Sequence, residues 1–134
     1  MTALSLTKKT VVFDNDQSQC LALCNLLEGR DYQTVPVYLL SDLNSLLQKK
    51  SCLVVIIDLD TVSLDNRTIR DLTKKYPEVY FLCMSSERFH PELKEAICYH
   101  IYACINKPVD MDELIYWLRS IYEDEAEVHV PKEV

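Results

Sequence analysis

Apolar residues in this chain gather in short strand-like runs that alternate with longer segments. The runs cover residues 10–13, 32–37, 52–57 and 79–84, and a weaker one covers residues 102–106. Short apolar runs bounded by turn residues are typical of strands that are buried on both faces of a parallel sheet. The pattern therefore predicts five strands.

The segments between the runs carry apolar residues at the i, i+3, i+4, i+7 spacing of one helix face. Three segments keep the whole spacing: Cys20, Leu23, Cys24 and Leu27; Ile69, Leu72, Thr73 and Tyr76; and Met111, Leu114, Ile115 and Leu118. Two shorter sets indicate two more helices: Leu43, Leu46 and Leu47, and then Leu93, Ala96 and Ile97.

Single residues mark the expected ends of these helices. We expect Gly29 to take a left-handed conformation after the first helix, Ser41 to cap the second, and Pro77 to stop the third. Alternating strands and helices imply a parallel sheet covered on both faces. We therefore predict an α/β fold: a doubly wound, five-stranded parallel sheet of order 2-1-3-4-5 with five helices.

Length and charge narrow the class of protein. A chain of 134 residues suits one domain with its own core. The net charge of −7 argues against direct nucleic-acid binding, which needs a clustered basic face. Residues 123–134 hold five acids and one lysine, so we expect a domain at 1–122 and then an acidic tail or the start of a linker.

The short apolar runs and the first residues of the chain favour a cytoplasmic protein. No run is long enough to span a membrane, and the first ten residues lack the features of a secretory signal. The six cysteines lie mostly in apolar stretches, where we expect them to act as small buried hydrophobes. Neither the cysteines nor the three scattered histidines have the spacing of a zinc site.

Polar residues follow the predicted strands at their carboxyl ends. They are Asp14, Asn15 and Asp16 after the first strand, Asp58 after the third, Ser85 and Ser86 after the fourth, and Lys107 and Pro108 after the fifth. In a sheet of order 2-1-3-4-5 the first and third strands are neighbours, so their acids converge on one crevice. An acid such as Asp58 at the end of a buried strand is costly without a partner.

This set of groups suits phosphoryl transfer. Neighbouring carboxylates repel one another unless a hard divalent cation joins them, and Mg²⁺ takes its oxygen ligands from carboxylates, water and phosphate. A lysine and a hydroxyl on the other side of the crevice can hold phosphate oxygens. Asp58 would then be the nucleophile and form an aspartyl-phosphate.

Over about residues 9–122, this ordered set resembles the receiver domain of two-component response regulators, which has a flavodoxin-like fold. The resemblance implies that Asp58 is the phosphoacceptor, Asp14 a metal-site acid, Ser85 the hydroxyl that contacts phosphate, and Lys107 the phosphate partner. It also implies a cis peptide bond before Pro108 and a metal ligand in the backbone carbonyl of Asp60.

Two positions depart from the family pattern. Asn15 stands where the family places a second metal-binding acid, and its amide oxygen can coordinate Mg²⁺ or Mn²⁺ without supplying charge, so we expect weak binding. Cys104 stands where the family has an aromatic switch residue. The resemblance implies that Ser85 and Cys104 are the two residues that move when the domain switches. Cys104 would gain less buried area in that movement than an aromatic residue would.

The function implied is that of a signalling phosphoacceptor rather than a classical enzyme. A histidine kinase or phosphotransfer protein would donate the phosphoryl group to Asp58, with Mg²⁺ present. The added negative charge would then shift a two-state equilibrium of the loops and of a face formed by the fourth helix, the fifth strand and the fifth helix. Four aromatic residues could dock an effector domain or a second copy there: Tyr99, Tyr102, Tyr116 and Trp117.

Two other functions remain open. Asn15 and Cys104 also suit a pseudo-receiver, an interaction module that is not phosphorylated. The sequence "DLDTV" also resembles the first motif of haloacid-dehalogenase phosphatases, in which Asp60 would be the general acid. In that family the nucleophile normally follows the first strand, whereas Asp58 follows the third.

Overall fold

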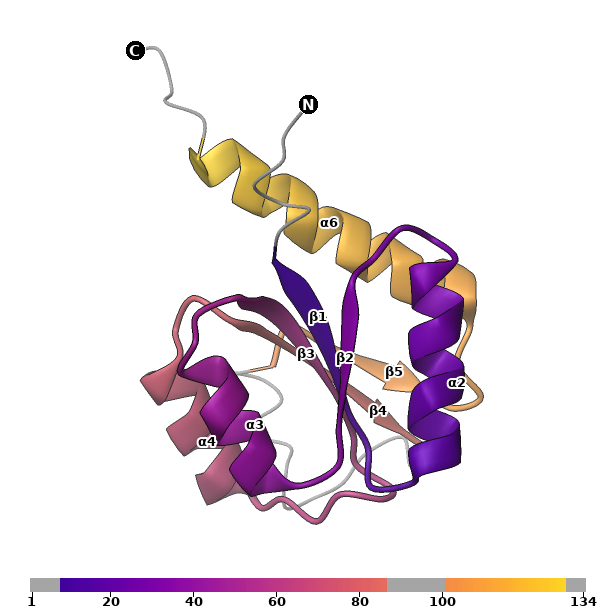
Figure 1. The fold of residues 1–134 in the computed structure, drawn as a ribbon, viewed down its shortest axis with the longest axis vertical. Helices are drawn as coiled ribbons and strands as arrows, with labels where there is room; N and C mark the ends of the chain where they lie inside the picture. Colours follow the sequence, from indigo (N-terminus) through magenta and orange to yellow (C-terminus); the bar gives the residue numbers. More distant parts are fainter. Residues whose placement is uncertain (1–7, 87–100, 130–134) are drawn as a thin grey trace.

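The computed structural model describes residues 8–86 and 101–129 as a layered α/β domain (Figure 1). Its elements are β1 (Lys9–Phe13), α2 (Gln17–Glu28), β2 (Thr34–Val37), α3 (Leu40–Leu47), β3 (Cys52–Asp58), α4 (Asn66–Lys75), β4 (Tyr80–Ser85), β5 (Ala103–Asn106) and α6 (Met111–His129). The helix expected around Leu93, Ala96 and Ile97 lies outside the described residues.

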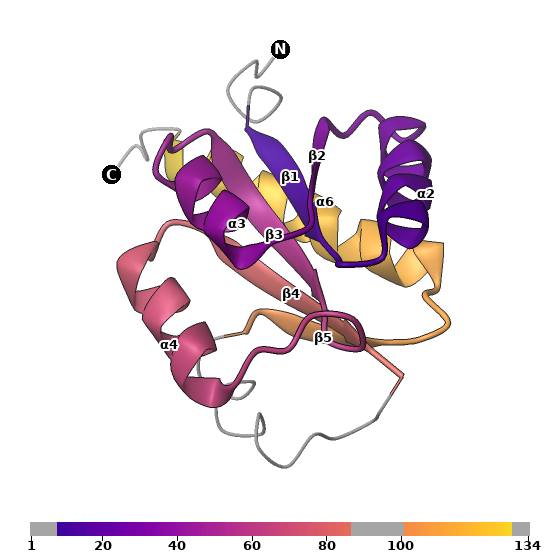
Figure 2. The same ribbon diagram turned by 60° about the horizontal axis from the view of Figure 1, so that its bottom comes forward.

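The five strands form one parallel sheet of order β2-β1-β3-β4-β5, which confirms the predicted fold class and strand order. Helices α2 and α6 cover one face of the sheet, and α3 and α4 cover the other (Figure 2). Because β3 pairs with β1 on one side and β4 on the other, it is the central strand of the domain.

Side chains of β3 supply both halves of the core. Val55 and Ile57 pack into the cluster under α3 and α4, while Val54 and Ile56 pack into the cluster under α2 and α6. Every residue of β3 is buried. The continuous apolar run therefore reflects a strand with two covered faces, and it ends directly in the buried acid Asp58.

Two of the expected helix ends are wrong in detail. Gly29 keeps a right-handed conformation (φ −65°), and the left-handed residue is Asp31 (φ 73°), because the chain makes further tight turns after α2 before it reverses. Helix α3 begins at Leu40 and is preceded by Leu39, so Ser41 lies inside its first turn and does not cap it.

Helix α6 continues through the expected boundary at residue 123 and ends at His129. Glu125 in this part of the helix forms an ion pair with Lys8, with 3.0 Å between Oε1 and Nζ. One turn earlier, the Tyr122 hydroxyl lies 2.9 Å from the Thr10 hydroxyl and donates to the Lys8 carbonyl. The first part of the expected acidic tail is therefore helical, and its Glu125 contacts Lys8, the residue before β1.

Four cysteines are buried as expected: Cys20, Cys24, Cys52 and Cys83. Burial is the main reason that the pKa of the Cys20 and Cys52 thiols rises to about 12. Cys104 differs from the expectation because its side chain is exposed, and Cys98 lies outside the described residues. Within the described ranges, no helix combines the length and apolar character that a membrane span requires.

We predict that Tyr122→Phe lowers the free energy of unfolding by about 1–2 kcal/mol, because the buried Thr10 hydroxyl loses its partner. Urea unfolding followed by circular dichroism measures this change. Tyr116→Phe is the matched control, because Tyr116 is 62% exposed on the same helix and should leave stability unchanged. Equal effects of the two substitutions would contradict the prediction.

Candidate functional site

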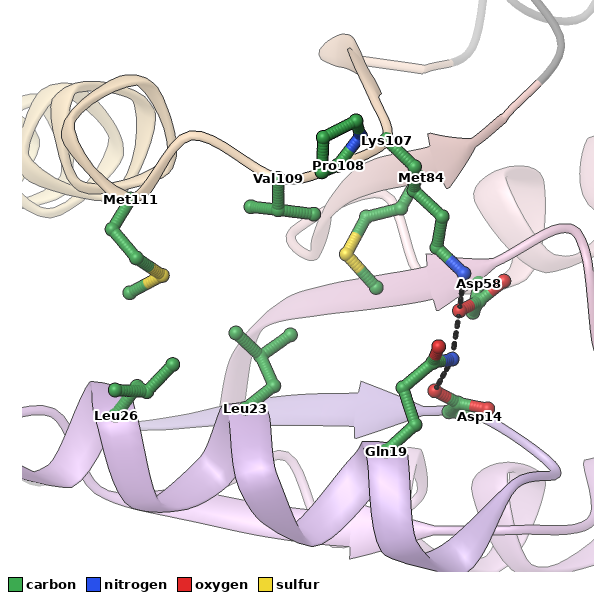
Figure 3. Close-up of a pocket in the computed structure, with 10 residues that line it drawn as sticks. All are labelled: Asp14, Gln19, Leu23, Leu26, Asp58, Met84, Lys107, Pro108, Val109 and Met111. Atoms are coloured by element: carbon green, nitrogen blue, oxygen red, sulfur yellow. Dashed lines mark hydrogen bonds and ion pairs between the residues drawn. The ribbon is translucent and has the colours of Figure 1, made fainter.

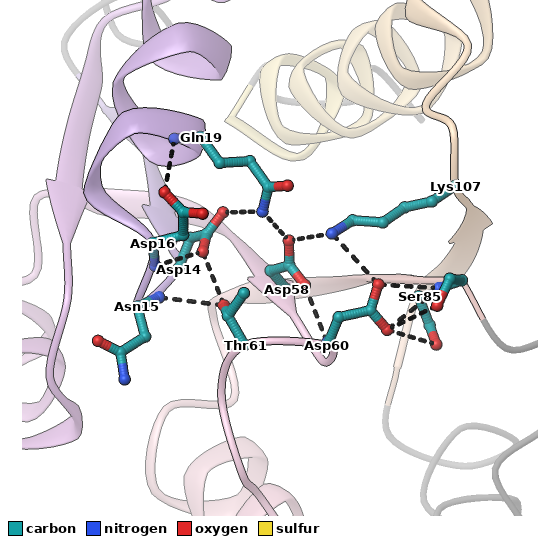
Figure 4. A network of polar contacts seen from close by, with 10 residues as sticks. Asp14, Asn15, Asp16, Gln19, Asp58, Asp60, Thr61, Ser85 and Lys107 are labelled. Atoms are coloured by element: carbon teal, nitrogen blue, oxygen red, sulfur yellow. Dashed lines mark hydrogen bonds and ion pairs between the residues drawn. The ribbon is translucent and has the colours of Figure 1, made fainter.

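A polar crevice lies at the carboxyl ends of the parallel strands (Figure 4). Asp14 directly follows β1, Asp58 is the last residue of β3, and Lys107 directly follows β5. The Lys107 ammonium contacts Asp58 Oδ2. The strand order thus brings together three predicted site residues that lie far apart in the sequence.

The Asp58 carboxylate is fully buried, and both of its oxygens accept hydrogen bonds. The backbone N–H of Asp60 donates to Oδ1 at 2.9 Å. Gln19 Nε2 donates to Oδ2 at 2.6 Å, and this oxygen also contacts Lys107. These partners offset the cost of burying a carboxylate at the end of an apolar strand.

The Asp14 carboxylate, 1% exposed, is held in the same way. Its Oδ1 accepts hydrogen bonds from the backbone N–H of Asp16 at 2.9 Å and from the Thr61 hydroxyl at 2.7 Å. Its Oδ2 accepts a bond from Gln19 Nε2 at 2.7 Å. One amide nitrogen therefore links the carboxylates of β1 and β3.

Sequence reasoning missed Gln19 and Thr61. Gln19 lies next to Cys20 and four residues before Leu23, and both of these residues are buried. This spacing places Gln19 at the edge of the helix face that packs on the sheet, so the sequence pattern could have indicated it. Thr61 lies in the loop after β3 and left no comparable periodic signal.

The Asp60 carboxylate turns toward the β4 end of the crevice. It accepts hydrogen bonds from the Ser86 backbone N–H at 3.1 Å and the Ser86 hydroxyl at 3.1 Å, and the Ser85 hydroxyl lies 3.5 Å away. Lys107 Nζ lies 3.3 Å from Oδ2. Desolvation raises the pKa of Asp60, but the Ser86 backbone bond and Lys107 outweigh it, so the pKa is lowered overall.

Lys107 bridges two acids and precedes a cis peptide bond to Pro108, as the resemblance implied. Desolvation lowers its pKa, but contacts with Asp58 and then Asp60 outweigh this effect, so its pKa is raised overall. The ammonium therefore stays charged at neutral pH.

Asn15 and Cys104 lie differently from the other candidates. The side chain of Asn15 is exposed and points away from Asp58, although its backbone N–H donates to Thr61 (Figure 4). Cys104 lies on β5 in register with Cys83 of β4. A hydrogen bond with Cys83 is the main cause that lowers the pKa of the Cys104 thiol.

The aromatic residues predicted as an interaction surface form edge-to-face contacts. Tyr102 packs against Tyr80 and Trp117, with ring centroids 5.4 Å and 5.7 Å apart, and Tyr116 packs against Trp117 at 5.2 Å. Tyr102 is 37% exposed and Tyr116 is 62% exposed. Tyr99, the fourth predicted member, lies outside the described residues.

A cavity of about 240 Å³ continues from the acids toward α2 and the start of α6 (Figure 3). Asp14, Gln19, Asp58 and Lys107 form its polar end. Its remaining wall is largely apolar and consists of Leu23, Leu26, Met84, Pro108, Val109 and Met111. The acids thus lie at one end of a pocket rather than on a flat surface.

The crevice offers the oxygen ligands that a hard divalent cation prefers, but the amide nitrogen of Gln19 occupies the space between them. Asp14 and Asp58 supply two converging carboxylates, and Mg²⁺ takes one or two from a protein. Gln19 Nε2 lies between them. Among the residues that the structure describes, no group of three or more His, Cys, Asp or Glu side chains is arranged to hold a metal ion.

Several solved structures share this fold. The signal receiver domain of an HD domain-containing protein from Pseudomonas fluorescens Pf-5 has a TM-score of 0.77 and 20% identity, over 90% of this chain and 98% of that chain. A response regulator receiver domain protein from Clostridium thermocellum has a TM-score of 0.76 and 17% identity, over 90% and 98%. A response regulator from Thermotoga maritima has a TM-score of 0.73 and 18% identity, over 87% and 98%.

No family model and no curated protein sequence matches the chain. The similarity is therefore one of structure: the chain has the fold of response-regulator receiver domains, as its sequence resemblance predicted. At these levels of identity the comparisons bear on the fold, so the roles of individual residues rest on the crevice itself.

The lowered pKa of Asp60 makes a prediction about acid stability. A carboxyl whose pKa is lower in the folded state contributes stability above its unfolded pKa, about 4, and that contribution is lost as the pH falls through the folded pKa. Between pH 6 and pH 3, wild type should therefore lose more free energy of unfolding than Asp60→Asn, by up to about 1 kcal/mol.

Urea unfolding at the two pH values measures this difference. Asp71→Asn is the control, because Asp71 is an exposed acid on α4 and its replacement should leave the acid-induced loss as in wild type. An Asp60→Asn variant that loses as much stability as wild type would contradict the assigned contacts.

Proposed function

We propose that this chain is a receiver module of two-component signalling, in which Asp58 accepts a phosphoryl group from a histidine kinase or phosphotransfer protein. The observation that carries the proposal is the contact of the fully buried Asp58 carboxylate with Lys107 at a crevice mouth formed by β1, β3 and β5. The similarity of the fold to that of a signal receiver domain is consistent with this proposal.

In the proposed reaction, one carboxylate oxygen of Asp58 attacks the phosphorus atom of the donor. An O–P bond forms, the bond from phosphorus to the donor nitrogen or oxygen breaks, and the leaving atom keeps the electron pair. Lys107 would contact the incoming phosphoryl oxygens, because its ammonium already lies against Asp58. Ser85, at the end of β4, would offer a hydroxyl to the same group.

Charge balance explains why a cation would be needed. Asp14, Asp58 and Asp60 bring three carboxylates to the crevice, and Lys107 is the cation in contact with two of them. A phosphoryl group approaching Asp58 would therefore meet net negative charge. Asp14, Asp58 and the backbone carbonyl of Asp60 would hold Mg²⁺ or Mn²⁺, which would neutralise that charge.

Asn15 would have to turn to take part in cation binding, because its side chain points away from the acids (Figure 4). Without it the protein supplies fewer ligands, so the proposed cation site is a weak one. Because the site would bind its cation weakly, phosphorylation should require a Mg²⁺ concentration in the millimolar range or above.

We predict that a small phosphodonor with Mg²⁺ adds one phosphoryl group to the chain and that Asp58→Asn abolishes the addition. Intact-protein mass spectrometry measures the gain, and peptide mapping locates it. Asp71→Asn, which changes an acid outside the crevice, should be labelled like wild type. Absence of label on wild type at high Mg²⁺ would contradict the proposal.

The second candidate is a pseudo-receiver that binds partners without phosphorylation. The orientation of Asn15 and the Gln19 bridge favour it, because the first leaves a cation with fewer ligands and the second occupies the space between the acids. A phosphatase of the haloacid-dehalogenase type is not proposed. Asp60, its required general acid, turns its carboxylate toward Ser86 and Lys107 instead.

The partner surface proposed from the sequence includes Tyr102, Tyr116 and Trp117. We predict that Tyr116→Ala weakens association with an effector domain or a second copy and leaves the protein folded, because Tyr116 is largely exposed. Sedimentation velocity with and without phosphodonor measures self-association. Leu39→Ala is the control for loss of another exposed apolar side chain; equal effects would argue against this face.

A further inference from the structure

We infer that the Gln19 side chain occupies the position where a shared cation would bind, so that it must leave before the cation enters. Gln19 would thus act as a positioning residue that lowers cation affinity and sets a threshold for phosphorylation. The inference rests on the proposed function, because it concerns access to the same acids. Its evidence is the bridge that Gln19 makes across them.

The bridge uses the full donor capacity of the amide. A primary amide nitrogen carries two hydrogens, and Gln19 Nε2 directs one to Asp14 Oδ2 at 2.7 Å and one to Asp58 Oδ2 at 2.6 Å. Both acceptors belong to buried carboxylates. The nitrogen therefore marks the point on which the two carboxylates converge (Figure 3).

A cation cannot share this point with the amide. Mg²⁺ binds oxygen ligands at about 2.0–2.1 Å, whereas the Gln19 nitrogen is 2.6 and 2.7 Å from the same two oxygens. The carboxylates are thus spaced for N–H···O bonds. An ion held by both of them would overlap the amide nitrogen, so occupancy by the ion and occupancy by Gln19 exclude each other.

The amide satisfies the acids without neutralising them. Hydrogen bonds to a carboxylate are stronger than bonds between neutral groups, so the bridge holds the crevice together in the absence of a cation. Its charge is zero, so the attraction of the crevice for a cation remains. Gln19→Lys would place a positive charge at the same point and would remove that attraction.

Gln19 also has a route out of the crevice. Its backbone is fixed in the first turn of α2, where its N–H donates to Asp16 Oδ1 at 3.1 Å. The residue is exposed to solvent overall, so the side chain can swing outward about its own torsions without moving the helix. Release then removes two hydrogen bonds from buried carboxylates, and an incoming cation would replace them.

Two substitutions of Gln19 test the inference in opposite directions. Gln19→Met keeps the length of the side chain but removes the donor, so Mg²⁺ should bind about tenfold tighter or more than in wild type. Gln19→Lys should weaken binding by at least as much. Gln17→Met, on the exposed side of the same turn, is the control and should bind Mg²⁺ as wild type does.

Isothermal titration with Mg²⁺, and Mn²⁺ binding followed by electron paramagnetic resonance, measure affinity without any phosphorylation. Circular dichroism checks that each variant is folded. If Gln19→Met is unstable, Gln19→Lys still tests the inference, because it keeps a hydrogen-bond donor at the site. Unchanged affinity in Gln19→Met would overturn the inference. Weaker binding in Gln19→Met would also overturn it, because Gln19 would then be a ligand.

The outcome is separable from that of the proposed function. Tighter Mg²⁺ binding by Gln19→Met with no label on Asp58 in any variant would support the inference and contradict the phosphoacceptor role. Labelling of wild type together with equal Mg²⁺ affinity in wild type and Gln19→Met would do the reverse. Absence of Mg²⁺ binding by both proteins would overturn the inference.

Discussion

A fully buried carboxylate at the end of a fully buried strand is the constraint on which this structure depends. Strand β3 is covered on both faces, and its last residue, Asp58, has no exposed surface. A carboxylate removed from water must find donors inside the protein. Residues at the ends of neighbouring elements provide them: the backbone N–H of Asp60, the amide of Gln19 and the ammonium of Lys107.

Each donor depends on a different part of the fold. Gln19 is placed by the start of α2, Lys107 by the end of β5, and the backbone N–H of Asp60 by the turn after β3. Because all strands are parallel, these ends meet at one edge of the sheet. The same geometry that stabilises Asp58 also places an ammonium where a phosphoryl group would need it. Stability and proposed function thus share one set of contacts.

The fold and the main acids were predictable because they leave periodic or positional signals. The apolar runs identify the strands, and the polar residues after them identify Asp14, Asp58 and Lys107 as neighbours. The contacts of Gln19, Thr61 and the Asp60 carboxylate were not predictable, because they depend on side-chain torsions that no spacing records. Asn15 is instructive: its residue type suits a metal ligand, but its side chain points away from the crevice.

The central claim is that Gln19 and a cation occupy the same position between Asp14 and Asp58. The most direct test is a pair of crystal structures, one from chelator-treated protein and one from protein saturated with Mg²⁺. The predicted result is Gln19 Nε2 between the two carboxylates in the first structure. In the second, a single ion should bind the same two oxygens and Gln19 should be turned outward. An ion bound elsewhere, or carboxylates of Asp14 and Asp58 that share neither a donor nor an ion, would contradict the central claim.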